Sequence, residues 1–269
     1  MVLSVPSFQD VIRAYYREHR RDFPWRRTTN PYHILVSEIM LQQTQVGRVM
    51  DKYERFIAAF PDFESLARTS FKSILGIWQG LGYNRRALSL QRTAEAVLVR
   101  FHGILPSSVD ELSGLPGIGQ TTAGAILAFA FNLPAVFIET NIRRTFIYHF
   151  FQDHEPVRDK DILPLVEATL DVQNPRDWYY ALMDYGSMLK KITENPNRRS
   201  LHYQKQAPFE DSDRMIRGLI VRILLEGPVL SRERLGQQIS AEGDRVESIL
   251  AQMVKDGLIR EEEGTYRIA

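Results

Sequence analysis

The sequence predicts an all-α fold that ends in a short β-hairpin. Apolar residues recur at helical spacing along almost the whole of the 269-residue chain, and no alternating pattern typical of a strand occurs before residue 220. The clearest stripe runs from Val46 to Phe60 and stops at Pro61, as expected for a helix that faces a core. A chain of this length can bury a sizeable core as one large or two smaller domains.

Helical periodicity places eight helices in the N-terminal part of the chain, with Asn30-Pro31 and Asn174-Pro175 as helix-start signals. In order, these predicted helices cover roughly 8–20, 31–42, 46–60, 85–101, 121–131, 141–151, 160–171 and 177–190. The pattern then breaks into polar segments around two prolines, which is typical of a linker. We predict a helical domain over 1–192, a linker over 193–213 and a second domain over 214–269.

The second domain resembles a winged helix, which consists of three helices and a β-hairpin. Helical patterns cover 214–226 and 232–240, Ser231 can cap the second of these, and a third helix carries its apolar stripe over 246–254. The hairpin is predicted from two short apolar segments on either side of Glu-Glu-Gly, namely Leu258–Ile259 and Thr265–Ile268.

The partner of this second domain stays open between DNA and protein. Winged helices often place their third helix in the major groove. The outer face of that helix would carry Arg245, Ser248, Gln252 and Lys255. Against DNA contact, residues 210–269 hold 9 basic and 12 acidic residues, whereas affinity for phosphate depends on basic charge.

Composition excludes several classes of chemistry. The chain has no cysteine, which excludes disulfides, thiolate nucleophiles, zinc–thiolate sites and cysteine-held iron–sulfur clusters. Its six histidines show no metal-ligand spacing, so we expect no metal and no cofactor. No apolar run could span a bilayer, and Arg13, Arg17 and Arg20 interrupt any signal-like stretch, so we expect a cytoplasmic protein without a membrane partner.

Residues 112–124, Leu-Ser-Gly-Leu-Pro-Gly-Ile-Gly-Gln-Thr-Thr-Ala-Gly, predict a tight turn between two helices. Gly117 and Gly119 can both adopt positive φ, which would leave the backbone N–H groups of the second helix free to bind an anion. Because the segment lacks the lysine of a nucleotide-binding loop, the anion favoured is a nucleic-acid phosphate. The alternative is an ordinary glycine turn between packed helices.

Two glutamates are candidates for the chemistry. Glu38 lies within the apolar stretch 34–41, and such neighbours raise the pKa of a carboxyl and suit it to general acid catalysis. The alternative for Glu38 is a position on the solvated edge of its helix. Glu139 precedes a predicted helix, where capping is the ordinary function of a carboxylate.

Residues 77–86, Ile-Trp-Gln-Gly-Leu-Gly-Tyr-Asn-Arg-Arg, form a glycine-bent aromatic loop that opens onto a helix. Aromatic rings next to Arg85 and Arg86 would suit a stacked nucleotide. The alternative is that Trp78 packs into the core and fixes the loop.

Together and in this order, these segments closely resemble the helix–hairpin–helix DNA glycosylase superfamily, and within it the adenine glycosylase branch known as MutY. The resemblance spans about residues 20–190. It rests on Ser-Glu-Ile-Met-Leu-Gln-Gln-Thr-Gln-Val at 37–46, Gly-Leu-Gly-Tyr at 80–83, Leu-Pro-Gly-Ile-Gly-x-x-Thr-Ala-Gly-Ala-Ile-Leu at 115–127 and Asn-Ile-Arg-Arg at 141–144.

The resemblance implies a two-lobed helical enzyme that flips a nucleotide out of the duplex, because the glycosidic bond cannot be reached inside the stack. Glu38 would protonate the departing base, and Glu139, oriented by Asn141, would stabilise the positive charge on the sugar. Gln42 would fill the gap in the stack, and Tyr83 would wedge beside the opposite base. The DNA contacts implied are Gln42, Gln43, Tyr83, Arg85, Arg86, Gly117, Ile118, Gly119, Gln120 and Arg143.

The chain departs from the family pattern at the catalytic carboxylate and at the turn. The family uses aspartate where this chain has Glu139, and the added methylene moves the carboxylate by about 1.5 Å if the backbone is unchanged. A misplacement of about 1 Å can cost on the order of 10²-fold in rate. We expect Glu139 to keep the role, since the residues after it are intact. Thr121 stands where bifunctional members carry a nucleophilic lysine, which predicts a monofunctional enzyme.

Two further departures concern the C-terminal part. Most members hold a [4Fe–4S] cluster with four cysteines that begin just after a stretch similar to 183–189, but here Lys190 stands at the first position. We therefore expect side-chain packing to hold 190–210 in place. MutY enzymes also usually carry a Nudix-like domain that senses 8-oxoguanine, where this chain has the winged-helix-like domain, so the base opposite the excised one stays open.

The function predicted is that of a monofunctional DNA glycosylase in base excision repair, acting as a monomer on double-stranded DNA with a mispaired or damaged base. Adenine opposite guanine or 8-oxoguanine is the expected substrate. One alternative is a related glycosylase for a mismatched or oxidised pyrimidine. The other is an inactive protein that binds distorted DNA.

Overall fold

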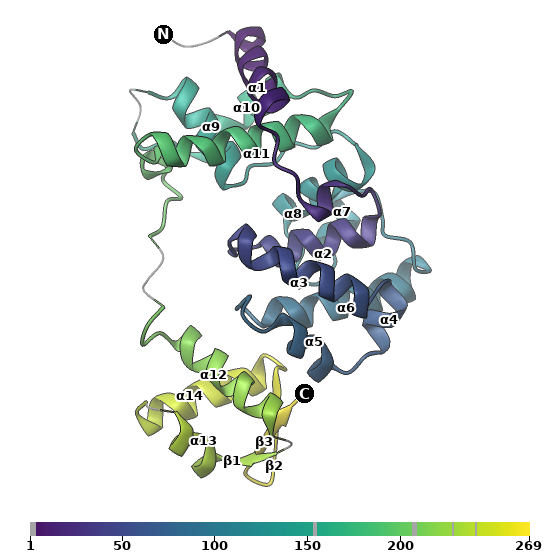
Figure 1. The fold of residues 1–269 in the computed structure, drawn as a ribbon, viewed down its shortest axis with the longest axis vertical. Coiled ribbons are helices and arrows are strands. Elements are labelled where there is room, and N and C mark those ends of the chain that lie inside the picture. The colour runs from purple at the N-terminus through teal and green to yellow at the C-terminus, as the bar shows by residue number, and fades with distance from the viewer. Residues whose placement is uncertain (1–3, 153–154, 206–208, 228, 240) are drawn as a thin grey trace. The chain divides into compact units, whose positions relative to one another are not determined.

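The computed structural model describes residues 4–152, 155–205, 209–227, 229–239 and 241–269 (Figure 1). Parts of the predicted first domain (1–3 and 153–154) and of the predicted linker (206–208) lie outside the described residues, as does residue 240 at the predicted end of a helix. The fold is mostly helical, as predicted, with strands described only in the C-terminal part and one isolated bridge between Val157 and Ser200.

The eight helices that the sequence predicts in the N-terminal part are all present, and the short helices between them were not predicted. The α-helices are α1 Val5–His19, α2 Pro31–Leu41, α3 Val46–Ala59, α4 Phe63–Arg68, α5 Phe71–Trp78, α6 Arg85–Phe101, α7 Val109–Ser113, α8 Gln120–Ile126, α9 Thr140–Phe150, α10 Asp159–Thr169 and α11 Pro175–Ile192. Short 3-10 helices cover Pro24–Arg26 and Pro196–Arg199, and a π-helical turn, Leu127–Phe131, continues α8. The missed helices α4, α5 and α7 span at most eight residues, too few for a clear period.

The chain packs into two compact units that are interleaved in sequence. One unit consists of Met1–Glu38, Pro106–Gly114 and Ile118–Lys205, and the other of Ile39–Leu105, Leu115–Gly117 and Gln206–Ala269. The predicted division at 192 and 213 follows the sequence pattern, whereas these units follow contacts between distant segments.

Aromatic packing between α1, α9 and α11 forms the core of the first unit. Phe8 of α1 is fully buried, with its ring centroid 5.2 Å from that of Phe146 and 6.1 Å from that of Trp178. Gly186 allows α11 to approach the start of α9 closely, because a Cβ at this position would lie 2.2 Å from the backbone oxygen of Asn141. The three helices thereby fix the segment that begins at Glu139.

Residues 193–205, which belong to the predicted linker, are packed within the first unit. Here Pro196–Arg199 form a 3-10 helix, and the bridge between Val157 and Ser200 follows it. Asn197 and Ser200 are buried although both are polar. Asn197 Nδ2 donates to the backbone oxygen of Thr140 at 2.8 Å, and Ser200 Oγ accepts from His202 N at 3.1 Å, as the burial of polar groups requires.

The second unit contains the Gly-Leu-Gly-Tyr loop between α5 and α6. Trp78 ends α5, is fully buried, and donates from Nε1 to the backbone oxygen of Gly82 at 3.1 Å. Of the two interpretations of 77–86, packing of Trp78 into the core is therefore what the structure shows for this residue. Gly80, Gly82 and Tyr83 all have positive φ, so the loop turns sharply before α6.

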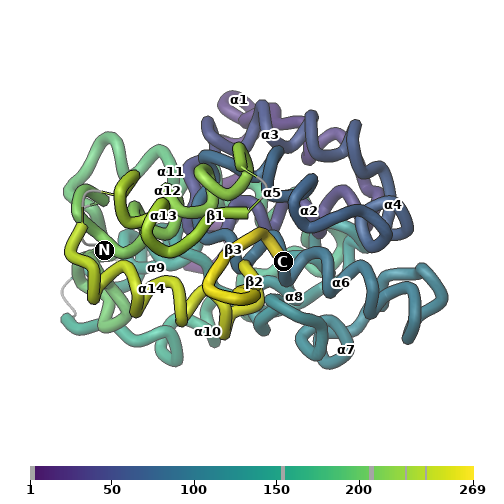
Figure 2. The backbone as a smooth tube through the Cα atoms, turned by 90° about the horizontal axis from the view of Figure 1, so that it is seen from below, coloured from purple at the N-terminus to yellow at the C-terminus, as the bar shows by residue number. Residues whose placement is uncertain are grey.

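The C-terminal part of the second unit has three helices and a small antiparallel sheet, as predicted. Figure 1 labels α12 (Asp213–Glu226), α13 (Arg232–Gln238) and α14 (Gly243–Lys255). Ser231 caps α13, as predicted, with its hydroxyl accepting from Arg234 N at 3.4 Å. The sheet has one strand more than predicted. The predicted hairpin consists of β2 (Ile259–Glu262) and β3 (Thr265–Ile268), and β1 (Leu230–Ser231) pairs with the other side of β3 (Figure 2).

No helix among the described residues has both the length and the apolar character that a bilayer crossing requires.

Candidate active site

Glu38 lies on α2 among buried apolar residues of the same helix. Its neighbours Leu35 and Ile39 are almost completely buried, and Glu38 itself is half-buried. The pKa of Glu38 is raised to about 8, first by burial and then by repulsion from Glu139, while Arg26 acts to lower it. The carboxyl is therefore mostly protonated at neutral pH, which is the state of a general acid.

Glu139 caps the start of α9. Its Oε1 accepts hydrogen bonds from the backbone N–H groups of Asn141 at 2.7 Å and Ile142 at 2.8 Å, and its Oε2 accepts from Asn141 Nδ2 at 3.2 Å. Burial raises the pKa of Glu139, while the two backbone donors, Arg144 and then Arg143 act to lower it. Glu139 therefore acts as the N-cap of α9, and its carboxylate is also near enough to Glu38 to repel the charge of that residue.

A hydrogen-bonded chain extends from Glu139 to α11. Arg144 is buried and donates from Nη1 to Asn141 Oδ1 at 2.7 Å and to the backbone oxygen of Gly186 at 2.8 Å. Arg144 Nε donates to Asn195 Oδ1 at 3.0 Å. Arg144 thus holds the amide that donates to Glu139, and Asn195 holds Arg144.

The segment after α11 also fixes the start of α9 through polar contacts. Asn197 Nδ2 donates to the backbone oxygen of Thr140 at 2.8 Å. Arg199 donates to the backbone oxygens of Phe151 and Gln152, and its own backbone oxygen accepts from Val157 N at 2.8 Å. In the described part of 190–210, hydrogen bonds therefore hold the segment in place, in addition to the side-chain packing that the sequence predicted.

Arg26, its partner Asp184 and Tyr180 were not among the site residues that the sequence predicted. Arg26 forms a bidentate ion pair with Asp184, whose side chain is 1% exposed, and its guanidinium lies 4.3 Å from the ring centroid of Tyr180. Burial raises the pKa of Tyr180, and the negative charge of Glu38 raises it further, so Tyr180 lies close enough to Glu38 to interact with its charge. These residues come from segments more than 150 positions apart, and no local pattern signals their meeting.

The glycine turn has a different conformation at each of its two glycines. Gly117 has φ +77°, and a Cβ there would lie 2.7 Å from Ser89 Cβ, so this position requires glycine. Gly119 has φ −91° and ψ 174°, which corrects the expectation of positive φ at both positions. Gly119 is instead the N-cap of α8, and a Cβ there would meet no atom within 4 Å.

The other residues of the turn divide into anchored and exposed positions. Ile118 is buried and anchors the turn. Gln120 and Thr121 begin α8 and are exposed, although Gln120 Nε2 donates to Ser113 Oγ at 3.1 Å. Thr121 is the second residue of the helix.

Gln42 and Gln43 form the turn that follows α2. Gln43 is exposed with φ +51°, and Gln42 donates from Nε2 to the backbone oxygen of Gly117 at 3.3 Å. Gln42 and Gly117 belong to the same compact unit, so this bond lies within that unit.

Arg86 connects the Gln42 turn to the Gly-Leu-Gly-Tyr loop. Its guanidinium donates to the backbone oxygens of Ile39 at 2.8 Å, Met40 at 2.9 Å and Gly82 at 3.1 Å, among others. Its Nη2 also donates to Thr44 Oγ1 at 2.9 Å. The guanidinium of Arg86 thus binds backbone oxygens at the C-terminal end of α2, and its predicted contact with DNA stays a prediction.

Two other predicted DNA-contacting arginines have acidic partners. Arg143 binds Asp159 through two hydrogen bonds of 2.6 Å, so it is tied to α10. Arg85 lies 3.6 Å from Asp256 but is largely exposed, so its guanidinium remains accessible.

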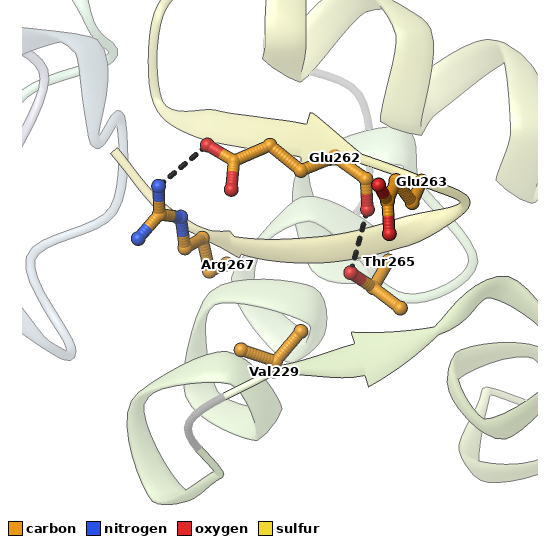
Figure 3. Close-up of a pocket in the computed structure, with 5 residues that line it drawn as sticks. All are labelled: Val229, Glu262, Glu263, Thr265 and Arg267. Atoms are coloured by element: carbon orange, nitrogen blue, oxygen red, sulfur yellow. Dashed lines mark hydrogen bonds and ion pairs between the residues drawn. The ribbon is translucent and has the colours of Figure 1, made fainter.

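The described residues contain no group of three or more His, Asp or Glu side chains that could hold a metal ion. A hollow of about 560 Å³ on the C-terminal sheet contains none of the predicted site residues (Figure 3). It is lined by Val229, Glu262, Glu263, Thr265 and Arg267. Arg267 pairs with Glu262, and Thr265 Oγ1 donates to the Glu262 backbone oxygen at 2.7 Å, so these polar groups satisfy one another within the hairpin.

Comparisons with known proteins match the part of the chain that holds Glu38 and Glu139. A family model described as "HhH-GPD superfamily base excision DNA repair protein" matches residues 36–163. An adenine DNA glycosylase of Buchnera aphidicola subsp. Baizongia pistaciae is 38% identical over 183 residues, which is 68% of this chain and 52% of that protein. The chain thus spans about half the length of such relatives.

Two further matches cover most of the matched protein. A thymine/uracil-DNA glycosylase of Methanothermobacter thermautotrophicus is 30% identical over 185 residues, which is 68% of this chain and 84% of that protein. The solved structure of a thermostable thymine-DNA glycosylase aligns with a TM-score of 0.64 and 27% identity, over 72% of this chain and 91% of that structure.

Proposed function

We propose that this chain, which belongs to the HhH-GPD superfamily of base excision DNA repair proteins, is a monofunctional glycosylase that excises adenine opposite guanine or 8-oxoguanine. One observation carries the proposal: a carboxyl with its pKa raised to about 8 faces a second carboxylate anchored by three hydrogen bonds. The pair supplies one proton donor and one negative charge, which are the two groups that hydrolysis of a glycosidic bond requires.

In the proposed reaction, Glu38 gives its proton to a ring nitrogen of the flipped base. The glycosidic bond then breaks, and both of its electrons leave with the neutral base. The sugar is left as an oxocarbenium-like cation, which the Glu139 carboxylate stabilises electrostatically. Water adds to the sugar and loses a proton, and an abasic site results. A protonated Glu38 favours a purine substrate, because the ring nitrogens of a purine can accept this proton.

The remaining predicted contacts would hold the duplex. In the proposal, the turn at Gly117–Gln120 binds a phosphate, Gln42 fills the gap left by the flipped nucleotide, and Tyr83 wedges beside the opposite base. Support comes from the open space around Gly119, which leaves room for a backbone to approach, and from the exposure of Arg85. Arg86 and Arg143 are proposed as positioning residues, since both bind groups of the protein.

The absence of lyase chemistry belongs to the proposal as well. Thr121 occupies the position of the nucleophilic lysine in bifunctional members, and a hydroxyl cannot form a Schiff base with the sugar. Treatment with borohydride during the reaction should therefore trap no covalent complex with DNA. A trapped complex would contradict the monofunctional assignment.

The substrate is tested with a panel of labelled duplexes. These carry adenine opposite 8-oxoguanine, adenine opposite guanine, thymine opposite guanine, uracil opposite guanine, and 5-hydroxyuracil. After incubation, alkali cleaves abasic sites and shows which strand has lost its base. Cleavage of the adenine strand alone supports the proposal. Binding without cleavage of any duplex over hours would instead favour a protein that recognises distorted DNA.

A pyrimidine substrate is the second candidate, favoured by a specific observation. The match to the thymine/uracil-DNA glycosylase covers 84% of that protein, compared with 52% for the adenine glycosylase of Buchnera aphidicola. Cleavage of the thymine or uracil strand in the same panel would select this candidate.

A further inference from the structure

Arg214 of α12 contacts Tyr83, the residue proposed to wedge beside the opposite base. Arg214 Nη1 donates to the Tyr83 hydroxyl at 3.1 Å, and its guanidinium carbon lies 6.0 Å from the centroid of the tyrosine ring. Both residues belong to the second compact unit. A side chain from the C-terminal helices thus reaches the loop that carries the proposed wedge.

Tyr83 is also held by its own loop, in a backbone conformation that tyrosine seldom adopts. Its φ is +49°, which lies in the left-handed region. Such a conformation persists only where the surroundings enforce it. The guanidinium of Arg86 lies 5.4 Å from the ring centroid, so two arginines, one from α6 and one from α12, approach this ring.

Other contacts attach the C-terminal helices to the same region of the unit. Asp256, at the end of α14, is nearly buried and pairs with Arg217 of α12 and with Arg85 of α6. Gly257 lies against α6, since a Cβ there would be 3.1 Å from Arg92 Nη2 and 3.6 Å from Leu88 Cδ2. The contact between Arg214 and Tyr83 is therefore one part of a packed surface.

The predicted DNA-reading face of α14 is partly occupied by contacts within the protein. Arg245 pairs with Asp213 at 2.7 Å, and Gln252 Nε2 donates to Asp256 Oδ1 at 2.8 Å. The adjacent hairpin carries three consecutive glutamates, 261–263, at the end of β2 and in the turn that follows, and negative charge opposes contact with phosphate. These features favour a role in which the C-terminal helices act on the glycosylase loop.

We propose that Arg214 is a positioning residue for Tyr83, through which the C-terminal domain sets the discrimination of the base opposite the excised one. This inference rests on the proposed function of Tyr83 as a wedge. Arg214 fixes the phenol group before DNA arrives, so the ring enters the stack in one orientation and less ordering is required on binding.

The proposal is tested by Arg214→Gln and Tyr83→Phe, alone and combined. Each variant removes one partner of the hydrogen bond, and Tyr83→Phe leaves the ring and the packing of α12 in place. The control is Arg222→Gln, which removes the same charge from an exposed position on the same helix. Single-turnover excision and duplex affinity are measured for the best substrate of the panel, with different bases opposite the excised base.

We expect both single variants to lower the ratio of excision rates between preferred and disfavoured opposite bases by about three- to tenfold, the range for one hydrogen bond. The double variant should match the single variants, because all three lack the same bond. Arg222→Gln should keep the wild-type ratio. Wild-type discrimination in Arg214→Gln, or effects that add in the double variant, would overturn the proposal.

A second readout separates this inference from the proposed function. Duplexes with 2-aminopurine placed next to the mismatch report unstacking as an increase in fluorescence, and this signal needs no excision. If the wild type excises no base, the proposed function fails. The inference then stands if Tyr83→Phe and Arg214→Gln reduce the mismatch-dependent signal equally, and it falls if neither changes it.

Discussion

Glu38 and Glu139 carry the same side chain in opposite surroundings. Glu139 starts a helix and accepts three hydrogen bonds, two of them from backbone N–H groups. The pKa of Glu38 is set by burial, by repulsion from Glu139 and by attraction to Arg26, and no hydrogen bond contributes to it. The charged form of Glu139 is thus stabilised by three hydrogen bonds, whereas that of Glu38 is favoured only by the attraction to Arg26.

The difference shows how the surroundings of two glutamates favour the protonated form of one and the charged form of the other. Two carboxylates that repel each other share a proton unequally, and the proton goes to the one whose anion is less stabilised. The hydrogen-bond donors on Glu139 favour its anion although burial raises its pKa, which supports the proposal that Glu38 carries the proton. The predictions below test this assignment, in order of decreasing expected effect.

The largest effect is expected for Glu38→Gln. The amide keeps the size of the side chain but cannot protonate the leaving base, so the single-turnover excision rate should fall by about 10³-fold. Duplex affinity, measured by fluorescence anisotropy, should stay near the wild-type value. The control is Glu18→Gln at an exposed position of α1, which should excise normally. A wild-type rate in Glu38→Gln would remove Glu38 from the mechanism.

Glu139→Gln should lower the same rate by about 10²-fold. The amide oxygen can still accept from the backbone N–H groups of Asn141 and Ile142, so the start of α9 remains capped while the charge that stabilises the sugar is lost. Glu139→Asp keeps the charge and should retain more activity than Glu139→Gln. If Glu139→Gln excises at the wild-type rate, Glu139 serves only as a helix cap.

The pH dependence should give about a tenfold loss of rate at one unit above the pKa of Glu38. Its protonated form is the active one, and that form predominates below a pKa of about 8 and declines as the pH rises through it. Single-turnover rates measured between pH 6 and 9.5 should therefore fall on the alkaline side. Glu38→Gln should lack this fall, and an identical alkaline limb in both proteins would assign it to another group.

Asn195→Ala should have the smallest effect, with a loss of about 1 kcal/mol in the free energy of unfolding and a few-fold lower rate. The variant leaves Arg144 Nε without its partner and loosens the chain of bonds that ends at Glu139. Denaturant unfolding and single-turnover excision measure the two effects. Asn174→Ala is the control, because this side chain does not cap its helix. An unchanged rate with lowered stability would limit Asn195 to a structural role.

Sequence patterns sufficed for the longer helices and for the family, but not for the short helices α4, α5 and α7. The apolar period of 3.6 residues predicted eight long helices, and the three helices and the hairpin at the C-terminal end were also found. The four segments from 37 to 144 indicated the glycosylase resemblance that the family match and the relatives confirm. Each of these signals is local, since it depends on the spacing of residues within one helix or one turn.

Charge partners could not be predicted in the same way. The aromatic loop and the family resemblance predicted DNA contacts for Arg86 and Arg143, but a guanidinium also binds backbone oxygens and carboxylates, and the sequence does not show which of these lie nearby. In the structure, Arg86 binds carbonyl groups near the end of α2, and Arg143 binds Asp159. The groups that bind Arg86 and Arg143 depend on which segments the fold brings together.

The sequence by itself determined the longer helices, the absence of thiol chemistry and the two candidate carboxylates. It also predicted the positive φ of Gly117. Only the tertiary structure decided that the pKa of Glu38 is raised to about 8, that Glu139 is anchored through Asn141 and Arg144, and that Arg214 reaches Tyr83. The physical reason is that helical period and turn chemistry are properties of neighbouring residues, whereas pKa values and charge pairing depend on burial and on groups brought together from distant parts of the chain.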